Sequence, residues 1–158
     1  MEQIWAPWRI EYIRKAKEVG CILCQRPREN NDEANFILYR GQNNFVILNT
    51  YPYTHGHLMV APYQHTANLA DLTERETMEH FDLIKKSMEL LKQVLNPAGF
   101  NIGLNLGKVA GAGVENHLHT RDIPRGREGP NFMPVLSDTK VISEALTATY
   151  KRLKEKVF

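Results

Sequence analysis

The sequence lacks the features that would indicate a membrane, secreted or nucleic-acid-binding protein. No apolar run approaches the roughly 20 residues that a membrane-spanning helix needs, so no membrane association is expected. Residues Met1 to Arg9 lack the basic start and apolar core of a secretory signal, which predicts a cytoplasmic location. Twenty basic against 18 acidic residues leave a net charge of +2, and no basic extension or zinc finger is present, so no nucleic-acid partner is expected. The only cysteines are Cys21 and Cys24, and in a cytoplasmic chain they are not expected to form a structural disulfide.

What is present fits one folding unit. A chain of 158 residues with 42% hydrophobic content can bury one sizeable core and has no room for a second. No repeat or low-complexity linker divides the sequence. We therefore expect a single domain over residues 1–158.

The apolar pattern predicts an α+β fold. Short apolar and β-branched runs predict strands at residues 35–40, 45–48, 57–61, 100–106 and 117–123. Thr73 and Glu76 form a capping box, which predicts a long helix that begins there and ends at Asn96. Its expected buried stripe is Phe81, Ile84, Met88, Leu91 and Leu95, and a C-terminal helix is expected to bury Val141, Leu146, Tyr150 and Leu153. This order of elements predicts an antiparallel sheet with helices packed on one side.

A glycine-rich turn leads into a pair of histidines. Gly111 and Gly113 shortly precede His117 and His119, and on a strand residues two apart point to the same face. Neutral imidazole can act as a nucleophile or bind a metal, and glycines let backbone amides approach a phosphate. The same residues are equally compatible with polar side chains on a solvated strand, so this stretch alone leaves both interpretations open.

Residues 117–125, His-Leu-His-Thr-Arg-Asp-Ile-Pro-Arg, resemble the signature of the histidine triad (HIT) family of nucleotide hydrolases and transferases. Residues 48–62, which contain Gly56-His57 and Pro62, are similar to the family's other hallmark, a turn followed by a Gly-His strand. Residues 5–9, 100–107 and 131–135 resemble more particularly the bacterial diadenosine tetraphosphate phosphorylases and their relatives. The resemblance covers most of the chain and implies a HIT-like fold, an antiparallel sheet with a long helix and a C-terminal helix packed on it.

The resemblance implies an enzyme that cleaves dinucleoside polyphosphates at the α-phosphate, by phosphorolysis or hydrolysis, and that forms a homodimer. His119 matches the central histidine of the family and is the expected nucleophile, so a nucleotidyl-histidine intermediate would pass its nucleotide to inorganic phosphate or water. The other matched positions are expected to bind substrate, and they are Asn49, Asn105, Gly111, Gly113, Val114, His117 and Arg121. Asn49 also fits a plain turn residue, His57 is expected to be a structural histidine, and His80 is expected to face solvent.

Cys21 and Cys24 have a spacing that lets both thiolates reach one metal ion, although buried or redox-active thiols fit it as well. Some bacterial HIT proteins carry a structural zinc on such a pair, together with a histidine after the Gly-His strand and the first triad histidine. In this chain those histidines are His65 and His117. The resemblance therefore implies a closed Cys2His2 zinc site with a structural role.

Three residues depart from the family pattern. Arg121 stands in place of the third histidine, and a guanidinium binds phosphate oxygens well but cannot deliver a proton at neutral pH. An amine leaving group must be protonated whereas a phosphate need not be, so a bias toward polyphosphates is expected. Thr120 and Asp122 break the apolar alternation, and Asp122 is expected either to pair with Arg125 or Arg127 or to mark a rearranged strand. The alternative function is a zinc-stabilised nucleotide-binding or partner-binding module whose catalysis is weak or lost because of Arg121.

Overall fold

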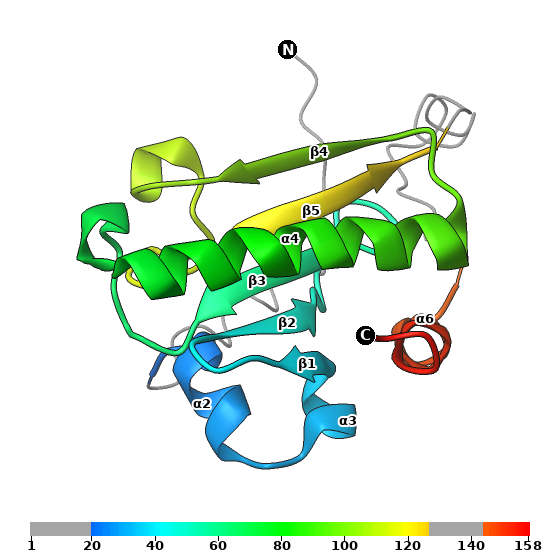
Figure 1. Ribbon diagram of the computed structural model, residues 1–158, viewed down its shortest axis with the longest axis horizontal. Coiled ribbons are helices and arrows are strands. Elements are labelled where there is room, and N and C mark those ends of the chain that lie inside the picture. Colours follow the sequence, from blue (N-terminus) through cyan, green and yellow to red (C-terminus); the bar gives the residue numbers. More distant parts are fainter. Residues whose placement is uncertain (1–19, 127–143) are drawn as a thin grey trace.

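The computed structural model describes residues 20–126 and 144–158, which contain a five-stranded antiparallel sheet and the helices that cover it (Figure 1). The strand order is β1-β2-β3-β5-β4, so β5 lies inside the sheet and β4 at its edge. The strands are β1 (Ile37–Arg40), β2 (Asn44–Leu48), β3 (Leu58–Pro62), β4 (Gly99–Leu104) and β5 (Thr120–Arg125). The α+β prediction is confirmed.

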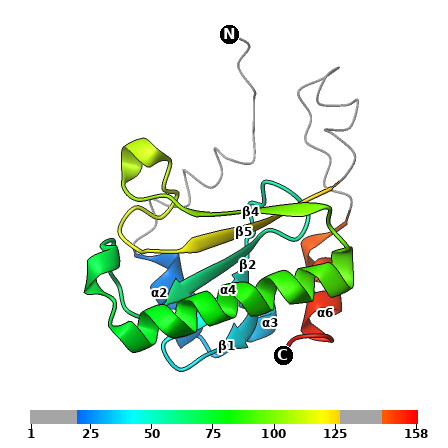
Figure 2. The same ribbon diagram turned by 45° about the horizontal axis from the view of Figure 1, so that its top comes forward.

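The helical segments are α2 (Ile22–Arg28), α3 (Asp32–Asn35), η1 (Leu69–Asp71), α4 (Glu74–Leu95), η2 (Lys108–Ala110) and α6 (Leu146–Lys154). The capping box that begins α4 is present, because the Thr73 amide donates to the Glu76 carboxylate over 2.7 Å and the Glu76 amide donates to Thr73 Oγ1 over 3.2 Å. The helix ends at Asn96, which has a φ of 47°, and Pro97 cannot continue it. Figure 2 shows α4 running along the length of the strands. In the part of the chain that the structure describes, no helix has both the length and the apolar character to cross a membrane.

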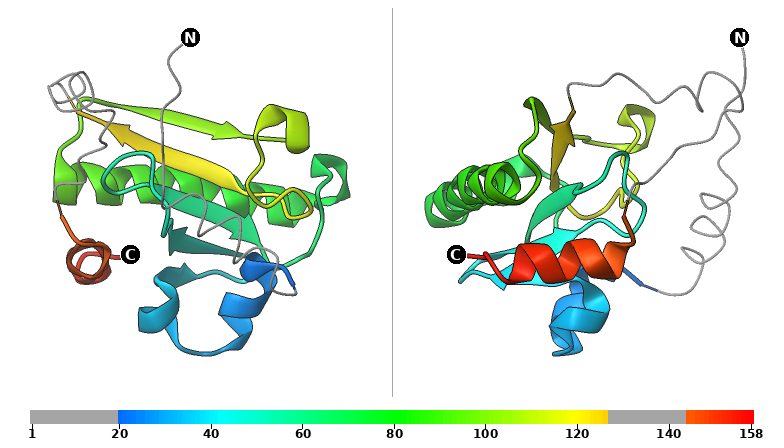
Figure 3. Two further views of the ribbon diagram at one scale, coloured as in Figure 1. Left: turned by 180° about the vertical axis from the view of Figure 1, so that it is seen from behind. Right: turned by 90° about the vertical axis from the view of Figure 1, so that its right-hand side faces the viewer.

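Both faces of the sheet are covered at β1, β2 and β3. On one face, α4 and α6 pack on a cluster that includes Leu38, Val46, Leu48, Leu58 and Val60. On the other face, α2 contributes Leu23 to a second cluster with Ile37, Phe45, Ile47, Met59 and Ala61. Seen from behind, the strands lie in front of α4 (Figure 3). The expectation of helices on one side only is therefore wrong for α2. The reason is that β2 and β3 are buried at every position, so both of their faces need a cover.

Helix α4 buries most of the expected stripe, and Met88 and Leu95 pack against the core cluster as partly buried side chains. Ile84 and Leu91 are buried as predicted, but Phe81 is 59% exposed and His80 only 3% exposed, so the predictions for these two residues are wrong. His80 hydrogen-bonds to Asn44 of β2 and Thr120 of β5, partners that only a residue on the sheet side of the helix can reach. His80 therefore shares the buried side of α4 with Leu83, Ile84 and Leu91.

Several element boundaries also differ from the expected ones. Strand β5 begins at Thr120, so His117 and His119 precede the strand and do not lie within it. Asn35 belongs to α3, and Phe36, with a φ of 57°, separates that helix from β1. On α6, Leu146, Tyr150 and Leu153 pack into the core as expected. Residues 5–9, 131–135 and Val141, which carried part of the sequence argument, lie outside the described residues.

Candidate functional site

The candidate site lies where β4 ends and β5 begins. Leu104, the last residue of β4, is paired with Thr120, the first residue of β5, so residues 105–119 form the connection at this end of the sheet. Gly107 and Gly111 have φ values of 83° and 80°, a region that favours glycine, and they bracket the short helix η2. The glycine and histidine motifs therefore share one compact connection.

His119 is buried, with 5% of its surface exposed, and its imidazole is held in one tautomer. Its Nδ1 lies 2.9 Å from the carbonyl oxygen of His117. Because a carbonyl only accepts hydrogen bonds, Nδ1 carries the proton and Nε2 of the neutral ring carries the lone pair. Burial lowers the pKa of His119, the hydrogen bond to His117 partly opposes this, and the charge of Arg121 adds to the lowering. The side chain is thus kept as neutral imidazole, the form that can act as a nucleophile.

Arg121 connects the glycine loop to the turn before β3. Its Nη1 donates to the Tyr53 hydroxyl over 3.3 Å, and its Nη2 donates to the Gly111 carbonyl over 3.1 Å. The guanidinium carbon lies over the Tyr53 ring, 5.4 Å from the centroid, and that ring stacks on His57 with an interplanar angle of 14°. Sequence reasoning missed Tyr53, for which the only signal was its place in the family-like segment 48–62.

The glycine loop is braced from within. The Gly111 carbonyl accepts a second hydrogen bond from Asn105 Nδ2 over 3.1 Å, and the Gly111 amide donates to the Lys108 carbonyl over 3.0 Å. The turn of η2 thus uses the Gly111 amide in this structure, and a contact between Gly111 and a phosphate stays a prediction. Val114 packs against the apolar cluster around α2, and Gly113 is exposed.

Asn49 forms the turn that follows β2. Its Oδ1 accepts the amide of Tyr51 over 2.9 Å, and its Nδ2 lies 3.4 Å from Nδ1 of His57. His57 is fully buried and accepts the amide of Tyr53 over 3.1 Å, in agreement with a structural histidine. These contacts support the interpretation of Asn49 as a turn residue, whereas its contact with a ribose is implied by resemblance alone.

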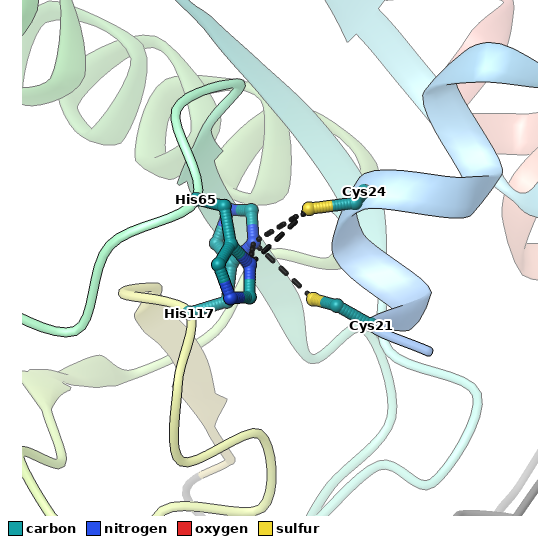
Figure 4. Close-up of side chains that lie close together, drawn as sticks. All are labelled: Cys21, Cys24, His65 and His117. Carbon is teal, nitrogen blue, oxygen red and sulfur yellow. Dashed lines mark hydrogen bonds between the residues drawn. The ribbon is translucent and has the colours of Figure 1, made fainter. Parts of the chain in front are cut away.

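The structure brings Cys21, Cys24, His65 and His117 together, and their ligand atoms all lie within 4.8 Å of one another (Figure 4). Cys21 precedes α2 and Cys24 lies on it, His65 follows β3, and His117 precedes β5. His117 Nδ1 is 3.3 Å from Cys21 Sγ, 3.4 Å from Cys24 Sγ and 3.3 Å from His65 Nδ1. A tetrahedral zinc with bonds of about 2.3 Å to sulfur and about 2.0 Å to nitrogen needs ligand separations of roughly 3.3 to 3.8 Å. These four residues fit such an ion.

The tautomer of His117 agrees with metal binding through Nδ1. Its Nε2 lies 2.8 Å from the carbonyl of Pro62, so Nε2 carries the proton and the Nδ1 lone pair faces the two sulfurs. A ligating histidine is normally oriented by a hydrogen bond of this kind from its other nitrogen. Because the carbonyl of His117 also holds His119, one residue links the candidate metal centre to the candidate nucleophile.

A chain of hydrogen-bonded polar side chains between α4 and the sheet was not predicted from the sequence. Asn44 Nδ2 donates to the Glu79 carboxylate over 3.1 Å, so its Oδ1 accepts the Nδ1–H of His80 over 2.8 Å. His80 Nε2 is then the acceptor for the Thr120 hydroxyl, 2.7 Å away. Burial lowers the pKa of His80 to about 4, so the ring is neutral. Thr120, unusual for the family, therefore has a partner supplied by α4.

Asp122 has no such partner. It is fully buried opposite Leu58, and neither carboxyl oxygen has a hydrogen bond from any residue of the described ranges. The expected pairing with Arg125 is wrong, because residues three apart on a strand point to opposite faces and Asp122 shares the α4 face with Thr120. Arg127 lies outside the described residues. Burial raises the pKa of Asp122 to about 7.

This chain belongs to the HIT domain family, which it matches over residues 30–128. It is 34% identical over 162 aligned residues to a Mycobacterium tuberculosis protein named AP-4-A phosphorylase, an alignment that covers 97% of this chain and 83% of that protein. The similarity extends beyond the family domain to both ends of the chain.

Solved structures show the same fold. A HIT family protein from Bacillus anthracis superposes with a TM-score of 0.63 at 25% identity, covering 86% of this chain and 91% of that one. A Zn-bound histidine triad family protein from Mycobacterium smegmatis superposes with a TM-score of 0.61 at 20% identity, covering 92% and 90% of the two chains. The HIT-like fold predicted from the sequence is confirmed.

Proposed function

We propose that this protein is an enzyme that cleaves dinucleoside polyphosphates, such as diadenosine tetraphosphate, at an α-phosphate with His119 as the nucleophile. The observation that carries the proposal is the fixed tautomer of His119, whose Nδ1–H is bound to the His117 carbonyl over 2.9 Å while Nε2 keeps its lone pair. The similarity to a protein named AP-4-A phosphorylase supports this substrate class.

In the first step, Nε2 of His119 attacks the α-phosphorus. The P–N bond forms as the bond to the bridging oxygen breaks, and the electron pair leaves with the shorter polyphosphate or nucleotide. In the second step, the oxygen of an acceptor, inorganic phosphate or water, attacks the same phosphorus, and the electron pair of the P–N bond returns to Nε2. A water acceptor also releases a proton to solvent. Phosphorolysis of diadenosine tetraphosphate gives ADP and ATP, whereas hydrolysis gives AMP and ATP.

The substrate contacts are part of the same proposal. Arg121 and Asn105 both donate hydrogen bonds to the Gly111 carbonyl in the glycine loop. When substrate binds, its phosphate oxygens can take the place of this carbonyl as the acceptor for both side chains. The other residues proposed to contact the nucleotide are Asn49, Gly111, Gly113 and Val114. His117 is proposed to act through its carbonyl, which holds the imidazole of His119. Thr120 and Arg121, which break the family pattern, both have specific partners in the structure, which favours a working site over a decayed one.

We also propose that Cys21, Cys24, His65 and His117 hold a structural zinc ion. Their ligand atoms all lie within 4.8 Å of one another, four of the separations are 3.3 to 3.4 Å, and a family structure is described as Zn-bound. Bound zinc would supply structural stability. The protein's own residues would then tie α2 to the segment that carries His119.

A homodimer, a cytoplasmic location and a single domain over residues 1–158 complete the proposal. Support for the dimer comes from the edge strand β4 and helix α4, which expose the large apolar side chains Ile102, Met78 and Phe81 at 42%, 66% and 59%. Apolar side chains exposed beside an unpaired sheet edge are typical of a protein interface.

The test is to incubate the purified protein with diadenosine tetraphosphate, with and without inorganic phosphate, and to separate the nucleotide products. His119→Ala is run alongside, with His55→Ala as the matched control, because His55 pairs with Glu144 and not with the site. ADP that forms only with phosphate identifies a phosphorylase, and AMP with ATP identifies a hydrolase, provided that His119→Ala is inactive and His55→Ala is not. Nucleotide binding without any product would support the binding-module alternative.

A further inference from the structure

Arg121 carries a positive charge that the described residues around it do not neutralise. Among the described residues, its guanidinium contacts are neutral groups, namely the Tyr53 hydroxyl, the Tyr53 ring and the Gly111 carbonyl. Among the ion pairs of residues 20–126 and 144–158, none involves Arg121, and the neighbouring carboxyl of Asp122 is buried on the opposite face of β5. The guanidinium is therefore positioned by neutral groups and able to attract an anion.

We propose that Arg121, positioned by Tyr53, makes the site selective for phosphate anions in both steps. In the first step a phosphate leaving group is favoured over an amine, and in the second step a phosphate acceptor is favoured over water. The inference rests on the proposed function, because it assumes attack by His119 on the α-phosphorus.

The first step has a proton balance that depends on the leaving group. When a polyphosphate leaves, the bridging oxygen takes the electron pair of the P–O bond and departs as a stabilised anion, so no proton is required. When a phosphoramidate is cleaved, the nitrogen takes the electron pair of the P–N bond and must gain a proton to leave as an amine. Arg121 cannot supply that proton, and the Nδ1 proton of His119 is directed to the His117 carbonyl.

The second step depends on the acceptor in the same way. Inorganic phosphate is already an anion at neutral pH, so its oxygen can attack the nucleotidyl-histidine without a base, and a guanidinium attracts it. Water must lose a proton as it attacks, and Arg121 cannot accept one. The substitution of arginine for a titratable histidine thus favours phosphate over water.

Tyr53 sets where the charge of Arg121 lies. Its ring stacks on His57 and also contacts the guanidinium of Arg121, and its hydroxyl accepts a hydrogen bond from Arg121 Nη1. The second guanidinium nitrogen is then directed to Gly111 on the glycine loop, where the phosphates of a substrate are proposed to lie. Tyr53 is a positioning residue, and Arg121 is the residue that contacts substrate.

The test compares kcat/KM for diadenosine tetraphosphate in the presence of phosphate with kcat/KM for adenosine 5′-phosphoramidate. The proteins are the wild type, Arg121→His, Tyr53→Phe and the control Arg75→His, which changes an exposed arginine on the first turn of α4. General acid catalysis contributes about 10²- to 10⁴-fold, so the wild type should prefer the polyphosphate by about 100-fold or more. Arg121→His should reduce this preference at least about tenfold by raising phosphoramidate turnover, and should raise the ratio of AMP to ADP formed from the polyphosphate. Tyr53→Phe should raise KM for the polyphosphate more than it lowers kcat, and Arg75→His should match the wild type.

Each result separates this inference from the proposed function. A wild type that cleaves both substrates equally, or an Arg121→His protein with an unchanged preference and product ratio, overturns the inference while the proposed function stands. A wild type that cleaves neither substrate overturns both, and turnover gained only by Arg121→His would show that Arg121 has ended catalysis.

Discussion

Replacing Asp122 with asparagine is expected to stabilise the protein, and to do so more as the pH rises. Both carboxyl oxygens of Asp122 are buried with no hydrogen bond from the described residues, and burial raises the pKa of this side chain from 3.8 to about 7. Above pH 4 the unfolded chain loses the Asp122 proton while the folded chain keeps it, so folding becomes less favourable as the pH rises. The cost grows up to about pH 7 and is constant above, where both states are ionised.

The magnitude follows from the pKa. At about 1.36 kcal/mol per pH unit, a pKa raised from 3.8 to about 7 corresponds to roughly 4 kcal/mol of lost stability at pH 8. Of this, roughly 2 kcal/mol is lost between pH 5.5 and pH 8. Asparagine keeps the shape of the side chain and removes its ionisation, and the burial of its NH2 group adds a cost that does not depend on pH.

The assay is urea unfolding of wild type and Asp122→Asn at pH 5.5 and pH 8. The free-energy difference between the two proteins should grow by about 2 kcal/mol over this interval. Protonation of the candidate metal ligands affects both proteins alike and cancels in the difference. Asp82→Asn is the control, because it makes the same change of side chain at a position that is 60% exposed. The same difference at both pH values for Asp122→Asn would show that the carboxyl is ionised in the folded protein and refute the reasoning.

Three further predictions concern the polar chain, the metal centre and the helix cap. Burial lowers the pKa of His80 to about 4, so as the pH falls this side chain takes up its proton in the unfolded protein before it does so in the folded protein. The free energy of unfolding should therefore fall by roughly 3 kcal/mol between pH 6.5 and pH 4. His80→Gln should lack this loss in urea unfolding, and a variant as sensitive to acid as the wild type would contradict the prediction. Wild type purified without added zinc should contain the metal by elemental analysis, while Cys24→Ser should contain less and melt at a lower temperature; a wild type without bound metal would exclude the site. Thr73→Ala removes the cap of α4 and should cost about 1 kcal/mol in urea unfolding with little change in activity, and no loss of stability would argue against the cap.

The elements with local signals were predictable from the sequence. The capping box marks the start of α4, Asn96 and Pro97 mark its end, and the β-branched runs mark β2 and β3. These signals are local because they arise from backbone hydrogen bonds and side-chain periodicity within a few residues.

What depends on contacts between distant segments could not be predicted. The burial of His80 on α4 depends on its partners Asn44 and Thr120, which lie 36 and 40 residues away. Tyr53 and Arg121 are 68 residues apart, and nothing in either local sequence indicates their contact. The spacing of Cys21 and Cys24 left metal binding and free thiols open, and only the family resemblance added His65 and His117, which the structure places beside them.

The central claim is tested most directly by trapping the reaction of the protein with diadenosine tetraphosphate in the absence of phosphate. The sample is quenched within the first turnover, digested under conditions that preserve phosphoramidates, and analysed by mass spectrometry. The account predicts an adenylyl group on His119, absent from His119→Ala and lost when phosphate is added before the quench, with ADP as the product. Turnover by the wild type with no adduct on His119, and with activity retained by His119→Ala, would contradict it.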